Sequence, residues 1–270
     1  MDWQNEKLIY KCQDDFGEMF IKELGLIRSL YFRDKKQSSL FMPESAVLVL
    51  SYAQAMMTSL LFQPDPKKVL ILGLGGGSLF HFLHNFFPNC QIEIVELRKT
   101  VIDLSHQLFK LPQNNSHLQV VHGDARRFVS ESVLQSKSYD LVLVDTFDQW
   151  GPTEFLSNIQ FIRDCYALLT KDGICSFNLW NRKEDAYQQT VGTFEKVFNG
   201  NCLELRLGRV NSNAILHGFA RQFNPKDLKN FKQTACEYEE KFGINFPHYH
   251  KLLMQQNVSL FKDLKKVMFT

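Results

Sequence analysis

The chain has 270 residues, of which 44% are hydrophobic and 22% charged, and its 31 Lys and Arg against 29 Asp and Glu leave a formal net charge of +2. This composition is typical of a folded globular protein and excludes a disordered chain, a collagen-like fibre and a protein that coats nucleic acid. A chain of this length can bury a full apolar core as one large domain, or as one large and one small domain.

Neither a membrane nor a metal is expected as a partner. The longest apolar-leaning stretch, residues 47–62, is interrupted by polar residues and falls short of the roughly 20 apolar residues that a membrane span requires. The N-terminal residues have no basic segment followed by an apolar one, so we expect no secretory signal. The six cysteines form no CxxC pair, which favours reduced thiols over disulfides or a zinc site. The expected compartment is the cytoplasm.

The first part of the chain predicts a small β-rich unit. Short runs of alternating character, such as residues 28–33 before the polar turn at 34–36, are typical of strands. A helix-like pattern follows from about Glu44 to Leu61. Two prolines, Pro64 and Pro66, then stop the helix. We therefore expect a β-rich unit with a linking helix over 1–62 and a second unit over 63–270.

From residue 67 the chain alternates between apolar runs and segments of helical period. The runs lie at 69–72, 92–95, 118–121, 141–144 and 174–177. Strands that are apolar throughout and separated by helices indicate an α/β fold with a parallel sheet covered on both faces. Two last runs, 203–207 and 214–220, predict a closing hairpin, and the tail from Asn224 predicts helices, with Pro225 near the start of the first.

A glycine-rich loop, Gly73-Leu74-Gly75-Gly76-Gly77, directly follows the first of these apolar runs. Glycines allow a sharp turn and a close approach to a ligand, and the helix that follows offers free N–H groups. The next predicted strand ends at Glu96, where α/β nucleotide-binding folds place an acid that accepts both hydroxyls of a ribose. The alternative is a tight turn with an exposed Glu96; we favour a nucleoside site.

Two further acids stand at the ends of predicted strands. Asp124, followed by Ala125, comes after the third, and Asp145 ends the fourth. Because ligands of open α/β sheets bind beyond the carboxyl ends of the strands, these acids and Glu96 should converge on one crevice. Helix capping would explain any one of them, but explains all three together poorly.

Together these motifs resemble the polyamine aminopropyltransferases, spermidine synthase and its relatives. The resemblance covers about residues 28–180, and Asp145-Thr-Phe-Asp148 with the nearby Gly151-Pro152 is its most specific part. It implies a Rossmann-like class I methyltransferase fold, with a seven-stranded, mostly parallel sheet behind a small N-terminal β domain. It also implies a homodimer.

The resemblance assigns roles to individual residues. Decarboxylated S-adenosylmethionine would be the co-substrate, with no prosthetic group. It would be held by the glycine loop, by Glu96 at the ribose and by the segment Asp124-Ala125 at the adenine. Asp145 would accept a proton from the attacking amine, which would be putrescine-like. Asp148, Tyr52, Glu154 and Trp150 are the candidate contacts to that amine.

Three positions depart from the pattern of this family. The loop acid that binds the amine of the aminopropyl arm is Gly76 here; the Tyr motif before the linker is matched only by Tyr52, one position out of register; and the Pro after the second aspartate is Gln149. Without the loop acid, ordinary S-adenosylmethionine would meet no repulsion at its carboxylate. An S-adenosylmethionine-dependent methyltransferase and a non-catalytic nucleoside-binding protein therefore remain alternatives.

Overall fold

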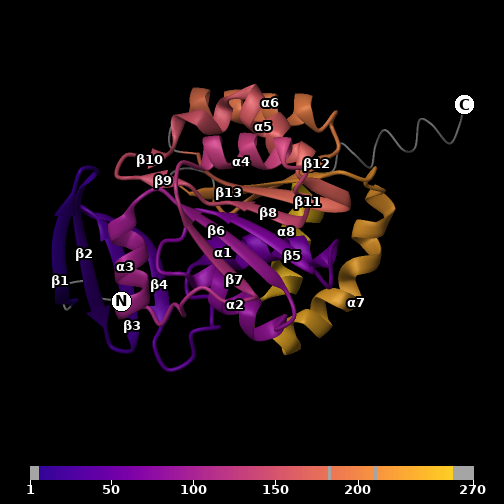
Figure 1. Ribbon diagram of the computed structural model, residues 1–270. Helices are drawn as coiled ribbons and strands as arrows, with labels where there is room; N and C mark the ends of the chain where they lie inside the picture. Colours follow the sequence, from indigo (N-terminus) through magenta and orange to yellow (C-terminus); the bar gives the residue numbers. More distant parts are fainter. Residues whose placement is uncertain (1–5, 182–183, 209–211, 258–270) are drawn as a thin grey trace, which may run out of the picture.

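The structure is a computed structural model that describes residues 6–181, 184–208 and 212–257 (Figure 1). Its first part is a four-stranded antiparallel sheet in the order β1-β2-β3-β4. The strands are β1 (Lys7–Asp14), β2 (Gly17–Leu24), β3 (Ile27–Phe32) and β4 (Lys35–Phe41). This small sheet lies at one end of the large sheet, as Figure 1 shows on the left. The predicted β-rich N-terminal structure is confirmed.

The predicted linking helix is shorter than the sequence pattern indicated. It begins at Ser51 rather than near residue 44, as α1 (Ser51–Met56), and continues as the 3₁₀ helix η2 (Met57–Leu61). The segment before it is held in another way, because Leu48 forms a β-bridge with Leu40 and its carbonyl accepts the Gln54 side-chain amide at 2.7 Å. Leu48 thus pairs with the small sheet, and residues 44–50 add no helical turn.

Within the described ranges the large sheet has seven strands, in the order β12-β13-β11-β8-β5-β6-β7. All neighbouring strands are parallel except β13, which is antiparallel to β11 and β12. Every apolar run of the second unit is a strand, and the mostly parallel α/β sheet is confirmed. The bounds are β5 (Lys68–Leu72), β6 (Gln91–Glu96), β7 (Leu118–His122), β8 (Tyr139–Val144), β11 (Leu169–Trp180), β12 (Cys202–Arg206) and β13 (Asn213–Phe219).

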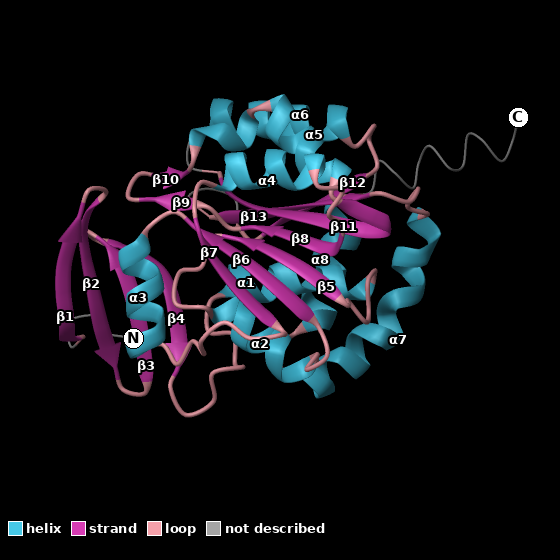
Figure 2. Cartoon of the chain, viewed as in Figure 1, coloured by secondary structure: helices cyan, strands magenta, loops and turns pink. Residues whose placement is uncertain are grey.

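Helices cover both faces of this sheet (Figure 2). On one face lie α4 (Ala125–Leu134), α5 (Ile159–Ala167) and α6 (Glu184–Val197), whose apolar side chains pack with Leu70 and Leu72. The other face, with Val69 and Ile71, packs against α1 and η2 and against α2 (Ser78–Phe86), α3 (Lys99–Leu108), α7 (Pro225–Phe242) and α8 (Phe246–Gln256). None of the helices in the described part of the chain has the length and apolar content needed to cross a membrane.

The small sheet shares an apolar core with the second of these faces. Met19, Ile21 and Leu30 of the small sheet are almost fully buried and belong to the same cluster as Ile71 and Phe80 of the large unit. This shared core fixes the small sheet against the large one, so that its loops stand beside the carboxyl ends of β5, β6 and β8.

Candidate active site

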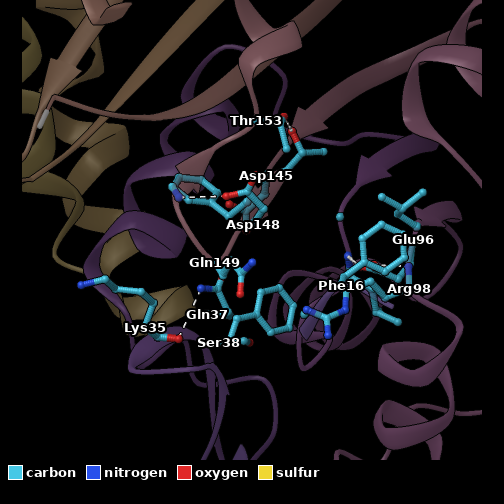
Figure 3. Close-up of a pocket in the computed structure, with 18 of the residues that line it drawn as sticks. Phe16, Lys35, Gln37, Ser38, Glu96, Arg98, Asp145, Asp148, Gln149 and Thr153 are labelled. Atoms are coloured by element: carbon cyan, nitrogen blue, oxygen red, sulfur yellow. Dashed lines mark hydrogen bonds between the residues drawn. The ribbon is translucent and has the colours of Figure 1, made fainter. Parts of the chain in front are cut away.

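A cavity of about 820 Å³ lies between the carboxyl ends of the parallel strands and the edge of the small sheet. One wall consists of the loops that follow β5, β6, β7 and β8; the other consists of the β1–β2 turn, residues 35–38 and the start of α1. Figure 3 shows Asp145 and Asp148 in one part of it and Glu96 with Arg98 and Phe16 in another. Clefts at this edge of an α/β sheet are the usual place for a ligand.

The glycine loop that follows β5 lies against the backbone of Asp145, the acid at the end of β8. Gly73 has a φ of +97°, and a Cβ there would lie 2.2 Å from the carbonyl oxygen of Asp145, so only glycine fits. Gly73 and Gly75, two of the candidate binding residues, line the cavity. Gly77, with a φ of +74°, instead turns the chain into α2; a Cβ there would face Leu111 and His81, and Gly77 does not line the cavity.

Glu96 is buried at the end of β6 and lines the cavity. Its carboxylate accepts hydrogen bonds from the backbone N–H groups of Leu74 (3.0 Å) and Arg98 (2.8 Å). Burial raises its pKa, while these N–H groups and the Arg98 charge act in the opposite direction. The Gly75 N–H also donates to this carboxylate, and because a carboxylate has about four lone-pair sites, Glu96 keeps some acceptor capacity for a ligand hydroxyl.

Arg98 ties the small sheet to the part of the cavity that contains Glu96. Its guanidinium forms an ion pair with Asp14 at 2.6 Å, donates to the carbonyl of Gly17 at 3.0 Å and lies over the Phe32 ring. Both partners of the ion pair are largely removed from solvent. Phe16, at the tip of the β1–β2 turn, is thereby held in the lining of the cavity.

Asp124 and Ala125 lie at the start of α4, and both line the cavity. The Asp124 carboxylate caps the helix by accepting from the Arg126 N–H at 2.8 Å, and it pairs with the Arg126 guanidinium at 2.6 Å. This guanidinium lowers the pKa of Asp124. Asp124 thus caps the helix and also lines the cavity, so the two interpretations of this residue are compatible.

Asp145, at the end of β8, is the most perturbed acid of the cavity. Its Oδ1 accepts from the Asn178 amide at 2.8 Å, and Asn178 in turn accepts from the Asn213 amide at 2.9 Å. Burial raises the pKa of Asp145 to about 6, with a smaller contribution from the charge of Glu96, while hydrogen bonds from Asn178 and Tyr52 oppose the rise. A carboxyl group with this pKa can take up a proton near neutral pH.

Tyr52 connects the small sheet to Asp145. Its hydroxyl donates to the carbonyl of Gln37 at 2.9 Å and also interacts with the Asp145 carboxylate. Burial, followed by the charge of Asp145, holds the pKa of Tyr52 well above its ordinary value. The start of α1 at Ser51 places Tyr52 in its first turn, which brings it into the cavity despite its shifted register in the sequence.

Replacing Tyr52 with Phe is expected to raise the pKa of Asp145, because the hydroxyl stabilises the ionised carboxylate. Any activity that needs ionised Asp145 should then reach half of its maximum at a higher pH than in the wild type. The measurement is the pH dependence of kcat for both proteins. Tyr10→Phe, at an exposed tyrosine that does not line the cavity, is the matched control, and an unshifted acid limb in Tyr52→Phe would contradict the expectation.

The loop after Asp145 is a short hairpin of β9 (Phe147–Asp148) and β10 (Gly151–Pro152). The Asp148 carboxylate accepts from the backbone N–H groups of Trp150 (2.6 Å) and Gly151 (3.1 Å), so this acid also shapes the turn. Asp148 and Trp150 line the cavity. Trp150 is 70% exposed, and the Arg33 guanidinium lies 5.2 Å from the centre of its ring.

Glu154, predicted to contact the amine, is placed elsewhere. It begins the 3₁₀ helix η3 (Glu154–Ser157), is exposed and does not line the cavity. The loop turns at Gly151-Pro152 before it reaches this residue, so the acidic part of the cavity contains Asp145 and Asp148 without Glu154.

Several lining residues carried no sequence signal. Gln37, Ser38 and Phe16 come from the small sheet, and Asn213 comes from β13, far along the chain. Asn178 had one available signal, since an amide inside the apolar run of β11 must find a partner when it is buried. Among the described residues no group of three or more His, Cys, Asp or Glu side chains is arranged to hold a metal ion.

Comparison with known proteins agrees with this geometry. Residues 50–202 match the spermine/spermidine synthase domain. The chain belongs to the spermine/spermidine synthase family. It is 31% identical over 241 residues to a polyamine aminopropyltransferase of Chromobacterium violaceum, covering 89% of this chain and 90% of that protein. The resemblance seen in the sequence is thereby confirmed.

Two solved structures place the fold of this spermine/spermidine synthase family member. Spermidine synthase from Thermotoga maritima superposes with a TM-score of 0.69 at 18% identity, covering 92% of this chain and 84% of that one. Human methyltransferase-like protein 13, solved in complex with SAH, gives 0.58 at 23% identity, covering 67% and 86%. The predicted methyltransferase-like fold is confirmed. The domain match begins at residue 50 and therefore leaves out the cavity wall that the small sheet contributes.

Proposed function

We propose that this protein transfers an aminopropyl group from decarboxylated S-adenosylmethionine to a putrescine-like diamine. The proposal rests mainly on the environment of Asp145. This side chain is a carboxyl group with a pKa of about 6, fixed by Asn178 and Tyr52, in a cavity whose other end presents the buried Glu96. Membership of the spermine/spermidine synthase family supports the same reaction.

In this proposal the nucleoside occupies the part of the cavity around Glu96. The Glu96 carboxylate accepts both ribose hydroxyls, and Asp124 accepts from the exocyclic amine of adenine. Gly75 lines the cavity and has no side chain, which leaves room for the chain that carries the sulfonium. In this arrangement the sulfonium lies between the Glu96 end of the cavity and Asp145, which line the same cavity.

The diamine enters from the side of Asp148 and Trp150. Its reacting ammonium group transfers one proton to Asp145, and the free nitrogen then attacks the aminopropyl carbon bonded to sulfur. A C–N bond forms while the C–S bond breaks, and the bonding electrons go to the sulfur, which leaves as neutral methylthioadenosine. The half-buried carboxylate serves as base and as charge partner for the amine, and alignment of nitrogen, carbon and sulfur supplies much of the remaining rate.

Methyl transfer from S-adenosylmethionine is the second candidate, and Gly76 favours it. The loop has no acid at this position, and a Cβ there would lie 2.8 Å from the Phe109 ring and 3.1 Å from the Ser38 hydroxyl. The carboxylate of S-adenosylmethionine would therefore meet no opposing charge from the loop.

One assay separates these functions. The wild-type protein is incubated with decarboxylated S-adenosylmethionine and putrescine, and in parallel with S-adenosylmethionine and putrescine, and the nucleoside products are quantified. The proposal expects methylthioadenosine from the first mixture. S-adenosylhomocysteine from the second mixture alone would replace aminopropyl transfer by methyl transfer, and no product from either mixture, or from other diamines, would leave nucleoside binding without turnover.

The assembly and the compartment belong to the same proposal. We infer a homodimer in the cytoplasm, with residues 1–62 and 63–270 as two units that close one cavity. The inference rests on the family resemblance, and sedimentation of the purified protein tests the dimer.

A further inference from the structure

Phe16 is a large apolar side chain that stays exposed on the lining of the cavity. It is 47% exposed and lines the cavity, as does Leu97, which is 45% exposed. Neither residue belongs to the two apolar clusters that form the core of the described part of the chain. Single apolar side chains on an outer surface need no explanation, but two of them on the lining of one cavity offer a surface to an apolar ligand face.

The β1–β2 turn holds the Phe16 ring in place. The Asp14 Oδ1 accepts from the Phe16 N–H at 2.9 Å, and the two carboxylate oxygens accept from the Arg98 guanidinium at 2.6 and 3.0 Å. Arg98 also donates to the Gly17 carbonyl at 3.0 Å and lies 5.7 Å from the centre of the Phe16 ring. Because charge-assisted bonds fix this small turn, a ligand that packs on the ring has little loop ordering to offset.

Both apolar side chains are near the acids that the nucleoside would contact. Leu97 directly follows Glu96 at the end of β6, and the Glu96 carbonyl accepts from the Gly123 N–H at 3.0 Å, one residue before Asp124. Figure 3 shows Phe16 beside Glu96. The exposed apolar surface is therefore in the same part of the cavity as these acids.

The polar contacts assigned to the nucleoside leave the faces of its base without a partner. In the proposed function, on which this step rests, Glu96 accepts from the ribose and Asp124 accepts from the exocyclic amine of adenine. Both contacts are made at polar edges, whereas the base also has two flat faces. An aromatic ring packs well on such a face, and the contact needs no hydrogen bond.

We propose that Phe16 is a nucleoside-binding residue whose ring packs against a face of the adenine base. The small sheet then contributes to the nucleoside part of the cavity, although the match to the family domain begins only at residue 50. A contact to the base is equally strong before and during the transfer at sulfur, so it contributes to nucleoside binding and leaves the chemical step unchanged.

Calorimetry with methylthioadenosine tests the proposal without requiring turnover. Phe16→Ala removes the ring, Phe16→Leu keeps an apolar side chain without a ring, and Phe16→Tyr keeps the ring. Tyr10→Ala is the matched control, because Tyr10 is an exposed aromatic residue of the same small sheet that does not line the cavity. Since Phe16 lies outside the core, the free energy of unfolding should be the same in all three variants of this residue as in the wild type.

Phe16→Ala is expected to weaken methylthioadenosine binding by roughly 5- to 150-fold, the effect of losing one aromatic partner of a base. Phe16→Leu should show a smaller loss, and Phe16→Tyr and Tyr10→Ala should bind as the wild type does. The KM for decarboxylated S-adenosylmethionine should rise by the same factor in Phe16→Ala, with kcat and the KM for putrescine unchanged. Stacking should also lower the ultraviolet absorbance of the bound base in the wild type and Phe16→Tyr, and less in Phe16→Leu.

Three results would overturn the proposal: wild-type affinity in Phe16→Ala, an equal loss in Phe16→Tyr, or an absorbance change that is the same in Phe16→Leu as in the wild type, which would place the ring against another part of the nucleoside. A wild-type protein that binds methylthioadenosine but forms none from decarboxylated S-adenosylmethionine and diamines refutes the proposed function and leaves the role of Phe16 standing. Turnover with unchanged affinity in Phe16→Ala refutes only the role of Phe16.

Discussion

Replacing Asp145 with Asn is expected to lower kcat by roughly 10²- to 10⁴-fold, the usual contribution of a general base. The amide keeps the size of the side chain and its place near Asn178, but it cannot accept the proton that the amine must lose. Nucleoside binding should change little, because Glu96 and Asp124 are intact. The measurement is the initial rate of methylthioadenosine formation with both substrates saturating.

Asp103→Asn is the matched control, since Asp103 pairs with Lys99 on α3 and does not line the cavity. The wild-type rate should rise with pH through about 6, as Asp145 loses its proton, and then level off. A variant Asp145→Asn with a wild-type kcat, or one that keeps this acid limb, would show that another group accepts the proton.

Asp145 should also make the free energy of unfolding depend on pH, in the opposite direction to the rate. The pKa of Asp145 is higher in the folded protein, about 6, than in an unfolded chain, about 3.9, so the folded state binds more protons between these values. The free energy of unfolding contributed by this group therefore falls as pH rises from about 4 to 6. Asp145→Asn should remove that part of the pH dependence.

The sequence was most informative where one physical rule governs many residues. Apolar runs such as 69–72 and 141–144 have to be buried on both faces, and all of them are strands of the large sheet. Because parallel strands end at the same edge, Glu96, Asp124 and Asp145 come together although 49 residues separate the first from the last. Local pattern and sheet topology together determined this half of the site.

The other half depends on contacts that no local pattern records. Leu48 pairs with Leu40 of the small sheet, and this pairing prevents the helix expected from about residue 44. Asn178 and Asn213 meet only because β13 lies antiparallel beside β11. Gln149 faces Gly17 across 132 residues of chain. Tertiary packing determines these contacts, and they cannot be predicted from the propensities of single residues.

Gly73→Ala is expected to destabilise the protein by about 3 kcal/mol or more, the range of backbone strain combined with a steric overlap. The new Cβ would lie 2.2 Å from the Asp145 carbonyl, at a φ of +97° that L side chains rarely adopt. Since backbone atoms are on both sides of the overlap, either the glycine loop or the end of β8 must move. Denaturant unfolding measures the loss.

Gly192→Ala is the matched control, because Gly192 lies within α6 and a Cβ there meets no atom within 4 Å. That change should stabilise the protein by about 0.5–1 kcal/mol through helix propensity. In molecules of Gly73→Ala that remain folded at low temperature, displacement of Asp145 should also lower kcat. A Gly73→Ala variant with wild-type stability and wild-type kcat would contradict the placement of the glycine loop against Asp145, because both losses are expected from the same 2.2 Å contact.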